Sequence, residues 1–189
     1  MHRSLSVALE DAEVLLRQFR NDPATLASMK GIADCLIAAF QAGHKLLTCG
    51  NGGSMADAMH VAEEFSGRFR LDRRPYPAIA LSDPAHMSCV ANDYGFDFVF
   101  SRQVEALGQP GDMLLLMSTS GDSTNLVKAA ETARAKGVTV ISALGRGGGA
   151  LLSLSDLVLM APGEGSDRIQ ELHMMAFHAI IEAVENEVR

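Results

Sequence analysis

The chain contains no tryptophan, and only 5% of its 189 residues are aromatic. Its three cysteines, Cys35, Cys49 and Cys89, are odd in number, widely spaced and set in apolar surroundings. Small secreted domains instead carry an even number of cysteines in a disulfide framework. The low cysteine content therefore excludes a disulfide-stabilised extracellular scaffold and indicates reduced thiols in a cytoplasmic protein.

Positive charge and long apolar runs are also scarce. Sixteen Lys and Arg against 23 Asp and Glu give a formal charge of −7 and a pI near 5.3. A nucleic-acid groove needs clustered cations, and the basic cluster in residues 68–74 stands at an expected helix end, where cations favour the dipole. No apolar run reaches the length of about 18 residues typical of a membrane span. Acidic residues at positions 10–13 also interrupt any signal peptide, so we expect neither nucleic acid nor a membrane as partner.

No linker, repeat or low-complexity segment divides the chain, so we expect one domain over residues 1–189. Two helices come first, at about residues 5–19 and 23–42, and short apolar runs then alternate with helical patterns. This alternation predicts an α/β fold in which helices cover both faces of a parallel sheet, a three-layer αβα arrangement. The expected strands are residues 45–49, 78–81, 113–117, 138–143 and 157–161, and the later helices are residues 54–67, 85–107, 123–136 and 167–188.

Residues 49–54 read CGNGGS and join an expected strand to an expected helix. A dinucleotide-binding fingerprint would need glycine where Met55 stands, and a Walker loop would need a Gly-Lys-Ser/Thr sequence that this turn lacks. A glycine turn that leads to Ser54 as helix N-cap is also an ordinary structural device. Taken alone, the turn leaves anion binding and simple capping both open.

A second turn, STSGDSTN at residues 118–125, follows the third expected strand and opens the next helix. Its five hydroxyl groups exceed what capping needs, and each hydrogen bond to a charged group contributes about 1.5–3 kcal/mol. We therefore predict a cradle for one phosphate monoester, without the lysine or magnesium ligand that a nucleoside triphosphate requires. In open parallel sheets ligands bind beyond the carboxyl ends of the strands, so both turns are expected near this site. The hydroxyls belong to Ser118, Thr119, Ser120, Ser123 and Thr124.

Acid–base groups stand on two of the expected helices. His60 and Glu64 are four residues apart and share a helix face, although such a pair is usually exposed and without function. The final helix carries Gln170 and His178, and the apolar neighbours of His178 are typical of a core histidine. Brought to one cleft, these groups would suit either a zinc site or a general acid and base next to a carbonyl. Spacing alone does not choose between the two.

Four segments resemble those of the phosphoheptose isomerases, within the sugar isomerase (SIS) fold: CGNGGSMADAMHVAEEFSGRFR, ANDYGFD, STSGDSTN and DRIQELHMMAFH. The resemblance covers nearly the whole chain. It implies a five-stranded parallel sheet of flavodoxin-like winding, preceded by a helical extension over about residues 1–42. It also implies a homotetramer whose active sites lie between subunits.

The resemblance further implies an aldose–ketose isomerase that converts sedoheptulose 7-phosphate to D-glycero-D-manno-heptose 7-phosphate through an ene-diol. This is the first step of bacterial ADP- or GDP-heptose biosynthesis, which leads to lipopolysaccharide or surface glycans. Glu64 would be the base and His178 the acid, and one zinc ion per subunit would be held by His60, Glu64, Gln170 and His178. The implied substrate-binding residues are Asn51, Gly52, Gly53, Ser54, Arg68, Asn92, Asp93, Ser118, Thr119, Ser120, Ser123, Asp167 and Gln170.

The implied roles of Glu64 overlap, because zinc stabilises the unprotonated carboxylate and makes it a poorer base. Either another group moves the proton, or Glu64 leaves the metal during turnover. Two other functions fit the fold: an SIS-type regulator that associates with the replication initiator, and an isomerase of another sugar phosphate. The His60 and Glu64 pair favours an enzyme, and ANDYGFD favours a heptose. Many members carry an aspartate where residues 145–149 read GRGGG, and we expect no catalytic role for that turn.

Overall fold

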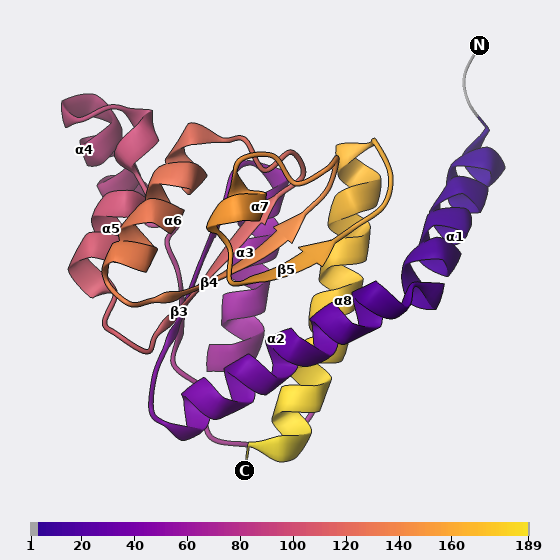
Figure 1. Ribbon diagram of the computed structural model, residues 1–189, viewed down its shortest axis with the longest axis horizontal. Coiled ribbons are helices and arrows are strands. Elements are labelled where there is room, and N and C mark those ends of the chain that lie inside the picture. Colours follow the sequence, from indigo (N-terminus) through magenta and orange to yellow (C-terminus); the bar gives the residue numbers. More distant parts are fainter. Residues whose placement is uncertain (1–3, 189) are drawn as a thin grey trace.

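The computed structural model describes residues 4–188, so residues 1–3 and 189 of the expected domain lie outside the described part. A five-stranded parallel sheet lies between two layers of helices (Figure 1). The strand order β2-β1-β3-β4-β5 is that of flavodoxin-like proteins, which confirms the predicted three-layer fold. The strands are β1 (Leu46–Gly50), β2 (Ala78–Ala80), β3 (Met113–Ser118), β4 (Thr139–Leu144) and β5 (Leu157–Met160).

The helices divide between the two faces of the sheet. One face is covered by α2 (Pro23–Gln41), α3 (Gly53–Ser66) and α8 (Ser166–Glu187), and α1 (Leu5–Asn21) projects outward beyond them (Figure 1). The expected helical stretch 85–107 consists of two helices and a 3-10 turn, and a short helix that the sequence did not indicate follows the turn after β4. On this opposite face lie α4 (Pro84–Asp93), the 3-10 turn η1 (Phe96–Phe98), α5 (Ser101–Leu107), α6 (Thr124–Ala135) and α7 (Leu151–Leu154).

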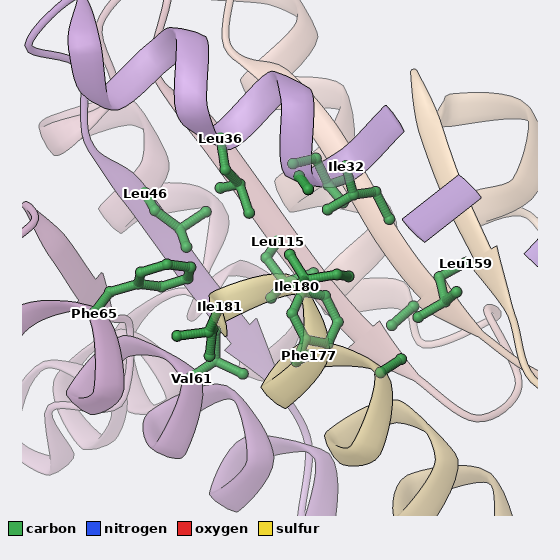
Figure 2. Close-up of a cluster of buried hydrophobic side chains, with 14 of the residues drawn as sticks. Ile32, Leu36, Leu46, Val61, Phe65, Leu115, Leu159, Phe177, Ile180 and Ile181 are labelled. Atoms are coloured by element: carbon green, nitrogen blue, oxygen red, sulfur yellow. The ribbon is translucent and has the colours of Figure 1, made fainter. Parts of the chain in front are cut away.

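The core on the α8 side holds α3 and α8 together against the central strands. Phe65 of α3 and Phe177 of α8 are fully buried with Leu46 of β1 and Leu115 of β3, and Leu36 of α2 closes the cluster (Figure 2). Burying one such side chain contributes about 1.5–3 kcal/mol. Since α3 carries the predicted base Glu64 and the predicted metal ligand His60, and α8 carries the predicted acid His178, this packing sets where those groups meet.

No apolar run as long as a membrane span was expected from the sequence, and α2 shows that this expectation was wrong. Its 19 residues reach a mean hydropathy of 1.2, so by length and composition this helix could cross a membrane. Lys30 and Asp34 interrupt the apolar run and pair on its exposed face at 2.6 Å. The opposite face of α2 buries Ile32, Leu36 and Phe40 in the core. A core helix of this kind is as long and as apolar as a membrane-spanning helix, so it passes the same test of length and hydropathy.

The strand order reverses at β1, which pairs with β2 on one side and β3 on the other. In the β1–β3 register Gly50 lies beside Met117, so the turns after both strands leave the same edge of the sheet. A side chain on Gly50 would place its Cβ 2.5 Å from the Ser54 carbonyl oxygen. The first turn can therefore close tightly over the sheet only because residue 50 is glycine.

His173 generates a prediction about acid stability. This α8 side chain is fully buried, with Nε2 3.0 Å from the Leu144 carbonyl oxygen, and burial lowers its pKa to about 4. The pKa of His173 in the folded protein lies below its value of about 6.5 in the unfolded chain. Above about pH 6.5 the side chain is neutral in both states and its titration costs no stability. As the pH falls toward about 4, the unfolded chain binds a proton that the folded protein does not, so the free energy of unfolding decreases. The gap between the folded and unfolded pKa values of His173 corresponds to a loss of roughly 3 kcal/mol in the free energy of unfolding once the pH is below both values. In His173→Gln, whose amide can still donate to Leu144, urea unfolding should show a correspondingly smaller loss between pH 6.5 and 4. Equal losses in both proteins would contradict the assignment.

Candidate active site

The first glycine turn does not use the Ser54 hydroxyl to cap the helix that follows. Gly52 occupies the N-cap position with a φ of 57°, so α3 begins at Gly53 and Ser54 is not the cap. The Ser54 hydroxyl instead accepts a hydrogen bond from Gln170 Nε2 of α8 at 3.2 Å. A Cβ on Gly53 would lie 2.7 Å from the same amide, so glycine there allows α8 to approach the turn.

The second turn folds its own hydroxyls around Gly121. Ser118 Oγ accepts the Gly121 N–H at 3.0 Å and Ser120 Oγ accepts the Asp122 N–H at 3.3 Å, while Ser123 occupies the N-cap position of α6 without a side-chain capping bond. Gly121 has a φ of +74°, and a Cβ there would collide with the Gly148 carbonyl oxygen at 1.9 Å. The turn therefore needs glycine for both its backbone conformation and its packing.

Two asparagines join the turns across the strand ends. Asn51 donates its amide to Asn125 Oδ1, and Asn125 donates to Asn51 Oδ1, each at 2.9 Å. Asn51 was predicted to bind substrate, and in the structure its side-chain amide links the two turns. Asn125 was not predicted, although it closes the STSGDSTN segment and is buried in the first turn of α6, where an unpaired amide would be costly.

The joined turns enclose a cavity of about 190 Å³ at the carboxyl edge of the sheet. The α3 and α6 N-termini both open onto it, so N–H groups and hydroxyls converge there as the anion hypothesis requires. No lysine or arginine is among its described lining residues, and Ser166 is a member that the sequence analysis missed. The lining consists of Asn51, Ser54, Met117, Ser118, Thr119, Ser120, Ser123, Leu126, Ser166 and Gln170.

Farther along α3, the structure brings His60, Glu64 and His178 into one cluster. Glu64 Oε1 lies 3.2 Å from His60 Nε2 and 3.5 Å from His178 Nε2. One potential ligand atom from each residue lies within 4.8 Å of the others, so a single metal ion could contact all three. The Phe69 ring stacks on the His178 ring at a centroid distance of 6.0 Å. Two imidazoles and a carboxylate are ligands that zinc accepts.

Two buried carboxylate oxygens beside this cluster lack hydrogen-bond donors among the described residues. They are Glu64 Oε2 and Asp57 Oδ2, which belong to the same helix as His60. Burial raises the pKa of Asp57 to about 6, and the neighbouring His60 partly opposes that shift. Unpaired buried acceptors are unusual in folded proteins, so these oxygens favour binding of a proton or cation at this position.

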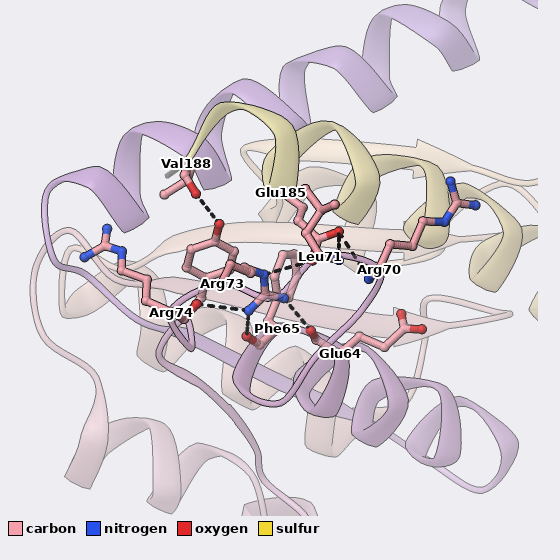
Figure 3. Close-up of polar contacts among 9 residues, drawn as sticks. Glu64, Phe65, Arg70, Leu71, Arg73, Arg74, Glu185 and Val188 are labelled. Carbon is pink, nitrogen blue, oxygen red and sulfur yellow. Dashed lines mark hydrogen bonds and ion pairs between the residues drawn. The ribbon is translucent and has the colours of Figure 1, made fainter.

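A buried ion pair holds the end of α3 against α8 (Figure 3). Arg73 Nε lies 3.1 Å from Glu185 Oε1, and the two side chains are only 7% and 2% exposed. The same guanidinium donates to the carbonyl oxygens of Glu64 at 2.7 Å and Phe65 at 2.8 Å. Helix α3 has no basic residue in its last turn, so Arg73 provides the positive charge that stabilises this helix end. The pair therefore fixes the backbone of Glu64 relative to the helix that carries His178.

Six predicted substrate-binding residues are not among those that line the cavity of their own chain: Gly52 and Gly53 of the first turn, and four residues outside both turns. Asn92 donates to Asp93 Oδ1 at 2.7 Å at the end of α4, and both side chains are exposed. Arg68 is exposed beyond the end of α3, and Asp167 lies 3.4 Å from Arg168 and borders a groove next to α1. The structure thus brings together the hydroxyl turns, Asn51 and Gln170, but not these four residues.

The fold and the cavity agree with the comparisons, which place this chain among the SIS-domain proteins. Residues 9–145 match the family described as the SIS domain, a sugar isomerase domain. A phosphoheptose isomerase from Neisseria gonorrhoeae superposes with a TM-score of 0.90 at 33% identity, covering 96% of this chain and 97% of that one.

Relatives at higher identity narrow the class. The phosphoheptose isomerase of Pectobacterium atrosepticum is 50% identical over 181 residues, which are 95% of this chain and 94% of that protein. The one from Fusobacterium nucleatum is 52% identical over 90% of this chain and 88% of its own length. This chain belongs to the phosphoheptose isomerase family of SIS-domain proteins.

Proposed function

We propose that this chain interconverts sedoheptulose 7-phosphate and D-glycero-D-manno-heptose 7-phosphate. The observation that carries the proposal is the arrangement along α3. Ser54 borders the anion cavity and His60 begins the acid–base cluster, and six residues of helix separate them by about 9 Å. A substrate with its phosphate several carbons from its carbonyl fits this spacing, and relatives named phosphoheptose isomerase support the same substrate.

The two oxygens of Glu64 suggest how its overlapping roles are divided. Oε1 faces both imidazoles, whereas Oε2 is buried without a described partner. Isomerisation moves a proton from carbon 1 of the ketose to carbon 2, and another from the hydroxyl on carbon 1 to the oxygen on carbon 2. We assign the carbon proton to Glu64 Oε2 and the oxygen proton to His178. The ene-diol is the intermediate between the two transfers, and each positioned group contributes about 10²–10⁴-fold.

We also propose a zinc ion on His60, Glu64 and His178, with Gln170 as the fourth ligand. The convergence of three ligand atoms supports this assignment, with Glu64 Oε1 facing both imidazoles and Oε2 left for the carbon proton. Gln170 donates through Nε2 to Ser54, which leaves its Oε1 as an acceptor. Bound there, zinc would act as a Lewis acid toward the substrate carbonyl.

A homotetramer with shared active sites is the assembly we propose. Asn92, Asp93 and Arg68 would then reach the cavity of a neighbouring copy, since they lie outside their own. Apolar surface is available for such contacts: Leu5, Leu9 and Val14 of α1 are exposed. A groove of about 590 Å³ between α2 and α8 adds further apolar lining from Met29, Ile37 and Ile180.

We place the reaction in the cytoplasm, as the first step toward nucleotide-activated heptose for bacterial lipopolysaccharide or surface glycans. The unpaired state of Cys35, Cys49 and Cys89 supports a reducing compartment. We further propose that residues 1–189 form one SIS domain. The packing of α2 on α8 and β5 supports this, because the helical extension then shares the core of the sheet.

Replacing the proposed base tests the reaction. In Glu64→Gln, turnover of sedoheptulose 7-phosphate should fall by at least about 100-fold, because the amide cannot accept the proton. NMR of the aldose product measures the rate. Glu182→Gln is the matched control, since Glu182 is an exposed α8 carboxylate that pairs with Arg70. Near-normal turnover of Glu64→Gln would remove Glu64 from its role, and an inactive wild type would favour another sugar phosphate or a binding function.

Zinc binding can be measured without turnover. The wild type should bind one zinc ion per chain, and His60→Ala should weaken binding by at least about 10–100-fold, the loss found when even an outer-shell partner is removed. Chelator competition gives the dissociation constants. The control is His44→Ala, because His44 lies beside Asp112 at the amino ends of the strands. Equal affinity in both variants would contradict the proposed ligand set.

Shared active sites predict complementation between two inactive variants. Asp93→Asn and Glu64→Gln should each lose activity as homotetramers, whereas mixed tetramers should regain part of it, because some sites then contain both native residues. Light scattering should give the mass of four chains. A one-chain mass, or mixtures as inactive as their parents, would contradict the proposed assembly.

A further inference from the structure

Arg146 lies in the turn after β4, for which the sequence predicted no catalytic role. Its φ is 47°, and no other non-glycine residue among residues 4–188 has a positive φ. This conformation costs an ordinary side chain about 1–2 kcal/mol, whereas glycine adopts it freely. Gly145 and Gly147 flank it, so the backbone of the turn is suited to glycine. Such outliers cluster at functional sites, which directs attention to what the arginine side chain contacts.

The guanidinium of Arg146 reaches the rim of the anion cavity. Its Nη2 donates to Ser166 Oγ at 2.8 Å, and Ser166 Oγ lies 3.2 Å from Thr119 Oγ1. Both hydroxyl residues line the cavity. Arg146 Nε donates to the Glu164 carbonyl oxygen at 2.8 Å. These contacts end on neutral oxygens, so they hold the guanidinium in place without neutralising its charge.

The turn that carries Arg146 is fixed against the phosphate cradle. Leu151 N–H donates to the Gly121 carbonyl oxygen at 3.0 Å, and Ala150 N–H donates to Asp122 Oδ1 at 2.8 Å. Gly121 and Gly148 also pack too closely for a side chain on Gly121. The cradle and the Arg146 turn are therefore one packed unit, which determines the position of the guanidinium.

The described lining of the cavity provides no cation to balance the charge of a phosphate dianion. Its described lining contains hydroxyl, amide and apolar groups, while the chain as a whole carries a charge of −7 that repels a phosphate dianion. Arginine forms strong, oriented hydrogen bonds with phosphate oxygens. We propose that Arg146 is a phosphate-binding residue, which contacts the phosphate dianion at the Ser166 and Thr119 side of the cavity. This rests on the proposed function only in taking the cavity as the phosphate end of the site.

Inorganic phosphate is the probe, with its dissociation constant measured by calorimetry. Arg146→Asn removes the charge but keeps a residue that tolerates the left-handed conformation, so the protein should fold with little change in Tm. We expect phosphate binding to weaken about tenfold in Arg146→Asn and by less than about threefold in Arg146→Lys. The control is Arg134→Asn, because Arg134 is also exposed and donates to a carbonyl oxygen, that of Leu154.

The outcomes separate a binding role from a structural one. Wild-type affinity in Arg146→Asn would overturn the proposal, as would an equal loss in Arg134→Asn, which would show a long-range effect of net charge. With sedoheptulose 7-phosphate, Arg146→Asn should raise KM about tenfold and leave kcat within about twofold. If the wild type binds phosphate but turns over no heptose, the reaction proposal fails and the Arg146 assignment stands. If the wild type binds no phosphate at millimolar concentration, the Arg146 assignment fails, and the reaction proposal is decided by turnover of sedoheptulose 7-phosphate.

Discussion

The parallel pairing of β1 with β3 is the constraint on which the candidate site depends. Because the strand order reverses there, α3 and α6 leave the same edge of the sheet toward opposite faces. Their N-termini therefore meet over one cavity, and the partial positive charge of each helix end adds to the other. The reciprocal bonds between Asn51 and Asn125 then lock the two turns together, so the geometry of the cradle follows from backbone register.

Helix α3 connects this cradle to the acid–base cluster, and α8 completes both ends. Gln170 of α8 meets Ser54 at the cavity, and His178 meets Glu64 two helical turns farther on. The cluster retains buried carboxylate oxygens without described donors, which costs stability. Packing of Phe65 and Phe177 in the core offsets such costs, so the large apolar interface between the sheet and its helices allows an unsatisfied polar site to persist.

Much of this arrangement could be predicted from the sequence. The strands could be predicted because buried parallel strands form short apolar runs. The phosphate cradle could be predicted because STSGDSTN contains more hydroxyl groups than helix capping needs. The residue types alone allowed either a zinc site or an acid–base pair, whereas the particular ligand set and the tetramer were implied by resemblance alone. Arg146 and Ser166 were not assigned, and Arg73 was assigned only as part of a basic cluster at a helix end. The contacts Arg146–Glu164, Arg146–Ser166 and Arg73–Glu185 join residues 18, 20 and 112 positions apart, without a periodic pattern that a sequence would show. Ser54 was misread as a possible cap because the cap depends on the φ of Gly52, which no residue spacing reports.

The Arg73–Glu185 pair also orders events during protein synthesis. Its partners are 112 residues apart in the chain, so Arg73 is synthesised on the order of ten seconds before Glu185, at about 5–20 residues per second. Until then Arg73 has no carboxylate to hold it beneath the Glu64 and Phe65 carbonyls. The fold can begin around the first strands, but the nascent chain acquires its chemistry only after the last helix has emerged and docked.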